Sequence, residues 1–177
     1  DAAMELAGWP TGPCKLMDRT SITSVVTIAD LIVERLDGRA DELLLLRALL
    51  DHGFDGVRSG LGLYDHRQPH GQGGAATLVD HAAAIGLIPR RPPRPGATPT
   101  RLADALVSEV AWCIGDGVVD TWESAAEAID NAYGFPGGLI DYVDNATDIV
   151  DRLGNLDGPR SHPNSVLVAR TDRSRHR

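Results

Sequence analysis

A short glycine–proline string occurs twice in this chain of 177 residues. The first copy, "GWPTGPCKLMD", runs from Gly8 to Asp18, and the second, "GFPGGLIDYVD", runs from Gly134 to Asp144. Both contain a glycine, an aromatic residue, a proline, a second glycine four residues after the first, and a closing aspartate. Glycine ends helices at low cost and proline cannot continue one, so each string predicts a sharp corner after a helix. The repeat predicts two related halves in one chain.

The composition favours helices packed on helices. Hydrophobic residues make up 42% of the chain and charged residues 24%, which is typical of a folded protein. Aromatic residues are only 5%, so aliphatic side chains must fill the core. The formal net charge of -8 argues against a surface that binds a nucleic-acid backbone. We therefore predict an all-α fold.

In the first half, two helices and one turned segment are predicted. Residues 21–36 are rich in β-branched residues, but apolar residues recur at helical spacing, at Ile22, Val25, Ala29, Ile32 and Leu36. A second helix is expected from Asp41, as its N-cap, to His52, with Gly53 as its C-cap. The glycine-dense segment 54–66 predicts an extended, tightly turned structure.

In the second half, three helices are predicted. The first spans 99–114, with one apolar stripe formed by Leu102, Leu106, Val110 and Cys113/Ile114. The second opens at Asp120 and Glu123, which have the spacing of a capping box, and continues to Asn131. The third spans 139–153, and the basic tail from Arg170 is expected to fray.

The predicted helices and the glycine- and proline-rich segments between them divide the chain into four parts. Residues 1–66 form the first half, and residues 67–99 form a Pro/Arg/Gly linker with room for a short helix. Residues 100–168 form the second half, and residues 169–177 the basic tail. Trp9, Trp112 and Phe135 lie among aliphatic residues and are expected in the core.

The order and spacing of these motifs resemble the C-terminal domain of 3-hydroxyacyl-CoA dehydrogenases. The matching residues of the first half are Gly8, Trp9, Pro10, Gly12, Pro13, Leu16 and Asp18, then Gly53, Gly56, Arg58, Ser59, Gly60, Gly62 and Tyr64. Residues 102–144 resemble the opening of another copy, with Ser108-Glu109 in its first helix. "GPRSHPNSVL", residues 158–167, is similar to the ending of the second copy in multifunctional fatty-acid oxidation proteins.

The resemblance implies two copies of the helical fold seen in 6-phosphogluconate dehydrogenase C-terminal domains, packed as a pseudo-dimer. It implies NAD-dependent oxidation of (S)-3-hydroxyacyl-CoA to 3-ketoacyl-CoA in fatty-acid β-oxidation. In this family the catalytic His, Glu and Ser lie in an NAD-binding Rossmann domain, and an Asn opens the first helical copy. We expect none of these positions in this chain, which begins with Asp rather than Met and resembles its family from the second helix onward. It was either processed or belongs to something longer.

The resemblance also implies roles for particular residues. Arg58 replaces a lysine that stands near the cofactor, and the turn of Pro10, Thr11 and Gly12 faces the acyl-substrate cleft. Asn131 falls where the multifunctional proteins place a substrate-contacting residue. Each has a structural alternative: Arg58 is a solvated cation beside a turn, and the Pro10–Gly12 turn is a helix-breaking corner under Trp9.

The expected partners are a Rossmann domain of the same or another chain, acyl-CoA, and a second copy of the chain. Self-association is expected because the missing first helix leaves Met4, Leu6 and the helix at 22–36 uncovered. The chain would then close the substrate cleft and pack against its partners. Whether it is itself an enzyme stays open, and the rival prediction is a stand-alone helical binding or dimerisation module.

Other candidate sites in the chain are weak. "GQGGAA", residues 71–76, fits a dinucleotide fingerprint in form, but no strand precedes it. His66 and His70 are four residues apart, but Pro69 interrupts any helix between them, so no metal site is predicted. Cys14 and Cys113 form no CxxC pair and are expected as free thiols in a reducing cytoplasm.

Overall fold

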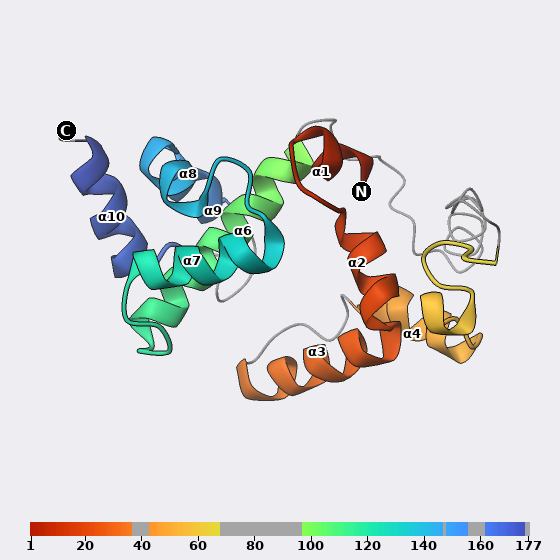
Figure 1. The fold of residues 1–177 in the computed structure, drawn as a ribbon. Coiled ribbons are helices and arrows are strands. Elements are labelled where there is room, and N and C mark those ends of the chain that lie inside the picture. The colour runs from red at the N-terminus through yellow and green to blue at the C-terminus, as the bar shows by residue number, and fades with distance from the viewer. Residues whose placement is uncertain (37–42, 68–96, 147, 156–161, 176–177) are drawn as a thin grey trace. The chain divides into compact units, whose positions relative to one another are not determined.

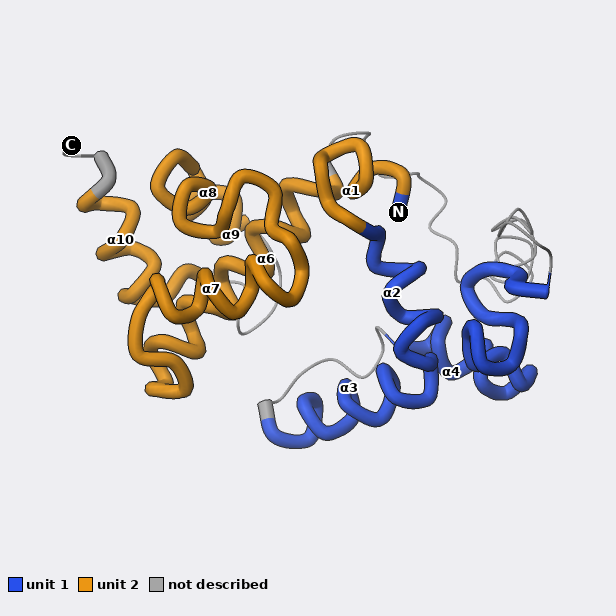
Figure 2. Tube along the Cα trace, in the orientation of Figure 1, with its two compact units in different colours: residues 1, 11–92 blue, residues 2–10, 93–177 orange. Residues whose placement is uncertain are grey.

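The computed structural model describes residues 1–36, 43–67, 97–146, 148–155 and 162–175 (Figure 1). Over these residues all helices and turns fit the predicted all-α fold, and the only β pairing is two isolated bridges, Gly56↔Leu61 and Leu61↔Asp65. The chain divides into two compact units, shown in Figure 2. Unit 1 comprises Asp1 and Thr11–Pro92, and unit 2 comprises Ala2–Pro10 and Pro93–Arg177. None of the described helices has the length and apolarity to cross a membrane.

The described residues of unit 1 form three helices and one 3₁₀ turn. They are α2 (Pro13–Thr20), α3 (Ile22–Leu36), α4 (Leu44–Asp51) and η2 (Val57–Ser59). The sequence predicted a corner at residues 8–13 but not α2, which begins directly at Pro13. Proline suits the first helical position because its missing N–H would have no intrahelical partner there. The unit packs around Ile22, Val26, Leu46, Leu49 and Leu63.

The predicted helix at 21–36 is confirmed as α3, but its buried face differs from the predicted stripe. Ile22 and Val26 are buried, whereas Ile32, which the stripe placed inside, is 50% exposed. The reason is that α3 packs on α2 and α4 near its start. Ile28, Leu31 and Ile32 together leave an apolar face on α3 that is about half exposed. The second predicted helix is confirmed as α4, while its expected N-cap, Asp41, lies outside the described residues.

The start of α3 is capped by Asp55, which is distant in sequence. Asp55 Oδ1 accepts hydrogen bonds from the Thr23 amide at 2.7 Å and from the Ser21 hydroxyl at 2.9 Å. A carboxylate at this position satisfies free amide groups and interacts favourably with the helix dipole. The bond from the Thr23 amide is the main cause that lowers the pKa of the Asp55 carboxyl.

In unit 2 the part of the chain that the structure describes forms the helices α1 (Ala2–Leu6), α6 (Ala97–Gly115), α7 (Trp122–Tyr133), α8 (Leu139–Asn145), α9 (Ile149–Gly154) and α10 (Ser165–Arg175). Its fully buried side chains include Val107, Leu139, Val143, Ile149, Leu153 and Leu167. Phe135 is buried as predicted, and Trp9 packs against the same core. The α6 helix is confirmed, but its predicted stripe is partly wrong. Val110 of the stripe is buried, but Leu102 is 38% exposed, and the helix is also buried through Ala103, Val107 and Ala111.

Three local predictions for the second half are corrected by the structure. Thr121, not Asp120, caps α7, because its hydroxyl accepts the Ser124 amide at 3.1 Å. The helix expected over 139–153 is two helices, α8 and α9, with a break after Asn145. The tail expected to fray from Arg170 continues as α10 to Arg175. It is held because Arg170 forms two hydrogen bonds to Asp144 and its guanidinium lies 5.9 Å from the centre of the Trp122 ring.

Replacing Ile28 and Ile32 of α3 by lysine tests whether the exposed apolar face causes association. We expect the wild-type chain to bind a hydrophobic dye or to self-associate, because exposed aliphatic side chains on one helix face are costly in water. The double variant should lose that behaviour with an unchanged circular dichroism spectrum. Thr27→Lys, on the same helix at an exposed position, is the control. A wild-type chain that is monomeric and binds no dye would contradict the prediction.

Removing the Asp55 cap should weaken α3 in a pH-dependent way. Asp55→Ala should lower the free energy of unfolding by about 1 kcal/mol at pH 7. A lowered carboxyl pKa stabilises the fold above the ordinary Asp value of about 3.9, and this stabilisation is lost as the pH falls through the lowered value. The difference between wild type and variant should therefore shrink below about pH 4. Amide exchange of α3 residues measures it, and a pH-independent difference would refute the assignment.

Candidate functional site

The first three residues of each repeated string, Gly8–Pro10 and Gly134–Pro136, pack against each other inside unit 2. The rings of Trp9 and Phe135 lie 4.9 Å apart between centroids, at an angle of 59°. A Cβ atom on Gly134 would lie 2.7 Å from Cγ of Pro10, and one on Gly8 would lie 3.4 Å from Cβ of Pro136. Each glycine therefore faces the proline of the other string, and the aromatic residues meet between them. Such reciprocal pairing is the pattern of a two-fold symmetric contact.

Both first glycines have backbone angles that explain the residue type. Gly8 has φ +93° and Gly134 has φ +61°, a region that side chains with a Cβ rarely adopt. The second glycines are also equivalent: Gly12 precedes α2 as its N-cap and Gly138 precedes α8 in the same way. The shared residues of the two strings thus have the same structural roles in both places.

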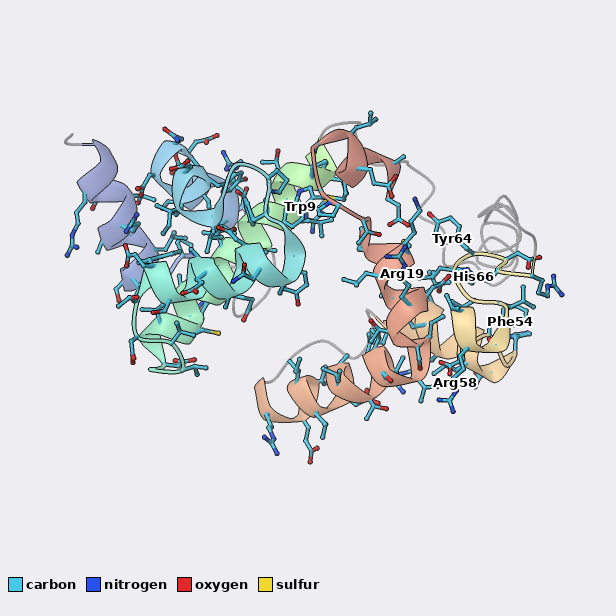
Figure 3. All side chains as sticks on the ribbon, in the orientation of Figure 1. Trp9, Arg19, Phe54, Arg58, Tyr64 and His66 are labelled. Carbon is cyan, nitrogen blue, oxygen red and sulfur yellow. The ribbon has the colours of Figure 1, made fainter. Side chains whose placement is uncertain are left out.

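The closing aspartate of each string binds a later segment of its own unit. Asp18 is 1% exposed, and its Oδ1 accepts the Leu63 amide at 2.8 Å. Its Oδ2 accepts the Tyr64 amide at 2.9 Å and bonds with His66 Nε2 at 2.7 Å (Figure 3). In unit 2, Asp144 accepts two hydrogen bonds from Arg170, at 2.7 and 2.8 Å. Asp18, a buried carboxylate, requires such partners, and the half-buried Asp144 holds Arg170 in the same way, so both aspartates contact a segment that follows.

Asp18 also explains the glycine-dense segment. A Cβ atom on Gly56 would lie 2.8 Å from Cα of Asp18 and closer still to its carbonyl oxygen. A Cβ atom on Gly62 would lie 2.8 Å from Cγ of the Asp18 carboxylate. Glycine is required at positions 56 and 62 because the chain approaches α2 too closely there for a side chain.

Asp1 lies at the N-terminal end of α2, opposite the end that carries Asp18. Its carboxylate accepts the amides of Cys14 and Lys15, at 2.8 and 3.0 Å, and the Tyr64 hydroxyl at 2.7 Å. A Cβ atom on Gly12 would collide with Asp1. Tyr64 therefore bonds to aspartates at both ends of α2, through its amide to Asp18 and through its hydroxyl to Asp1. Sequence reasoning missed the role of Asp1, because a capping residue so far from its helix leaves no local pattern.

The structure places the predicted site residues in different environments. Arg58 is exposed on η2, where its charge contributes to lowering the pKa of Asp55 (Figure 3). Pro10 and Asn131 are exposed, and Gly12 is buried against Asp1. Thr11 is half-buried, and its hydroxyl oxygen is buried with no hydrogen-bond partner among the described residues. Among the described residues, no hydrogen bond or ion pair joins Arg58 to Thr11 or Gly12.

Unit 2 contains a buried polar network that the sequence did not predict. Asp104 on α6 is 2% exposed and accepts hydrogen bonds from the Tyr142 hydroxyl at 2.7 Å and from Arg152 at 2.6 and 2.8 Å. Burial and then the Asp104 carboxylate raise the pKa of the Tyr142 phenol well above its ordinary value, so it stays protonated. This network joins α6, α8 and α9 through hydrogen bonds between its own polar groups.

The described residues offer little nucleophilic or metal chemistry. Burial raises the pKa of the Cys14 thiol, which keeps it in the less reactive protonated form. Among the residues that the structure describes, no group of three or more His, Cys, Asp or Glu side chains could hold a metal ion. The fingerprint at 71–76 and His70 lie outside the described residues.

Unit 2 has a cavity of about 210 Å³ beside Trp122 and Arg173 and another of about 180 Å³ beside Trp9 and Phe135.

Comparisons with known proteins agree with these motifs. Residues 1–66 match the family model for the 3-hydroxyacyl-CoA dehydrogenase C-terminal domain, which confirms the resemblance seen in the sequence. The chain is 25% identical to fatty acid oxidation complex subunit alpha of Shewanella sp. (strain ANA-3), over 96% of this chain and 25% of that protein. It is 28% identical to the protein of that name from Pseudomonas putida (strain GB-1), over 94% of this chain and 25% of that protein. The chain spans about a quarter of the length of the curated relatives it matches.

Comparing Gly56→Ala with Gly53→Ala separates two effects on stability. Both substitutions strain the backbone, but only the one at Gly56 also brings a side chain against Asp18. Both glycines have positive φ, +84° and +75°, but a Cβ on Gly53 meets nothing within 4 Å. Gly53→Ala should cost only the left-handed strain, about 1 kcal/mol. Gly56→Ala should cost about 3 kcal/mol or more, because the chain must also move away from α2. Amide exchange of Leu63 and Tyr64 measures both losses, and equal losses would contradict the steric argument.

Proposed function

We propose that this chain is the helical C-terminal part of an NAD-dependent 3-hydroxyacyl-CoA dehydrogenase, acting in fatty-acid β-oxidation. The observation that carries the proposal is the family match over residues 1–66, whose glycines and closing aspartate have clear structural roles. The alignments with the alpha subunits continue through the second half, since they cover more than nine-tenths of this chain. The enzyme would oxidise (S)-3-hydroxyacyl-CoA to 3-ketoacyl-CoA.

In this proposal the two halves form an internal pseudo-dimer. The reciprocal packing of Gly8–Pro10 with Gly134–Pro136 supports it, because corners of two separate subunits would meet in the same way across a two-fold axis. The pairing of Asp18 and Asp144, each with a later segment, extends the correspondence. In this proposal the chain supplies helices that close the acyl-CoA cleft. It also packs against a Rossmann domain or another subunit.

The Rossmann domain of the same or another chain would hold NAD, which would supply the hydride acceptor for the hydroxyl-bearing carbon of the substrate. From this chain, Arg58 is proposed to face the cofactor, since its exposed guanidinium is available to a phosphate. Pro10, Thr11, Gly12 and Asn131 are proposed to line the substrate cleft. Thr11 is the best supported of these, because a buried hydroxyl without a partner is costly unless something else bonds to it. We propose a cytoplasmic location, which suits the free Cys14 and Cys113.

A second candidate is a helical binding or dimerisation module without dehydrogenase activity. The apolar face of Ile28, Leu31 and Ile32 on α3 favours it, because such a face is suited to another helix. The coding sequence before Asp1 discriminates between the two. A G-x-G-x-x-G strand–turn–helix unit followed by a His/Glu pair would support the dehydrogenase, and a start codon directly before Asp1 would support the module.

The purified chain should not oxidise NADH with acetoacetyl-CoA. The reaction needs a bound nicotinamide and a base near the substrate, and the proposal assigns both to the Rossmann domain. The measurement is the absorbance of NADH over a range of acetoacetyl-CoA concentrations, with a complete 3-hydroxyacyl-CoA dehydrogenase as the positive control. Saturable NADH oxidation by this chain alone would overturn the division of roles.

A further inference from the structure

We propose that unit 2 binds a compact hydrocarbon group of a small molecule in the cavity beside the corner contact. The cavity measures about 180 Å³, and its lining includes Trp9, Phe135, Pro136, Tyr142, Ala103 and Thr100. These residues come from both repeated strings and from α6 and α8, so the cavity exists only when the two corners are packed together. The proposal does not depend on the proposed dehydrogenase function.

Three aromatic rings form much of the cavity wall and are held in place by their neighbours. The Trp9 and Phe135 rings are 4.9 Å apart, and those of Phe135 and Tyr142 are 5.3 Å apart at 63°, an edge-on arrangement. Tyr142 donates its hydroxyl hydrogen to the buried Asp104, so its polar end is already satisfied. No charged side chain lines the cavity. A hydrocarbon group placed here gains contacts with three rings.

The volume sets the size of the group. An apolar cavity of about 150 Å³ in another protein binds benzene, so this cavity suits a group of about six carbons. Whole ligands of drug size need about 300–1,000 Å³, so only one end of such a molecule would enter. An aromatic ring and the end of an alkyl chain share this chemistry, and the experiment separates them.

The test is a titration of the ¹⁵N-labelled 177-residue chain with benzene and, separately, with 1-hexanol, followed by NMR. Saturable shifts confined to the Trp9 indole and to the amides of Ala103, Phe135 and Tyr142 are expected with at least one probe. Tighter binding of benzene identifies a ring site, and tighter binding of 1-hexanol identifies a chain site. The absence of saturable shifts with either probe would overturn the proposal. Shifts of the same signals with protein concentration alone would also overturn it, because a second copy would then occupy the cavity.

Two variants and a matched control connect binding to the cavity. Thr100→Phe adds a ring at the exposed rim, and Ala103→Leu adds volume from the α6 wall. Each should weaken probe binding at least tenfold. Ala105→Phe, exposed on the same helix and outside the lining, should bind as wild type does. Circular dichroism confirms that each variant is folded, and wild-type affinity in both folded cavity variants would refute the site.

Discussion

Unit 1 depends on the buried carboxylate of Asp18. A charged group with 1% exposure is stable only if hydrogen bonds replace its water, and here two amides and His66 do so. Those donors belong to residues 63–66, which must lie against α2. Because that approach leaves no room for side chains, positions 56 and 62 must be glycine. Asp1 completes the arrangement by capping the other end of α2 and accepting the Tyr64 hydroxyl.

In unit 2 the corresponding constraint is the contact between the two corner strings. Gly8 and Gly134 leave space for Pro136 and Pro10, and the rings of Trp9 and Phe135 fill the centre. This reciprocity connects the sequence repeat to the proposed pseudo-dimer. It also forms the apolar cavity, since the same rings provide part of its wall. The polar network of Asp104, Tyr142 and Arg152 then joins α6 to α8 and α9.

Apolar residues at helical spacing predicted α3 and α6, and capping residues predicted α4 and α7. The errors came where a tertiary contact decided the outcome. The α10 helix does not fray because Asp144 and Trp122 hold Arg170, and neither is its neighbour in sequence. Thr121 rather than Asp120 caps α7, and boundaries of one residue are beyond what spacing can resolve. Of the predicted site residues, Thr11 gained a distinguishing feature that only atomic packing reveals: its buried hydroxyl has no hydrogen-bond partner among the described residues.

The sequence by itself determined the helical class, the two corners and the relation to the 3-hydroxyacyl-CoA dehydrogenase C-terminal domain. Those features are encoded locally, in apolar spacing and in glycine and proline at defined offsets. The tertiary structure decided which aspartate binds which segment, which face of α3 and α6 is buried, and that Trp9 meets Phe135. These depend on contacts between residues distant in the sequence, such as Trp9 and Phe135, which are 126 positions apart, and no local pattern specifies such a pairing.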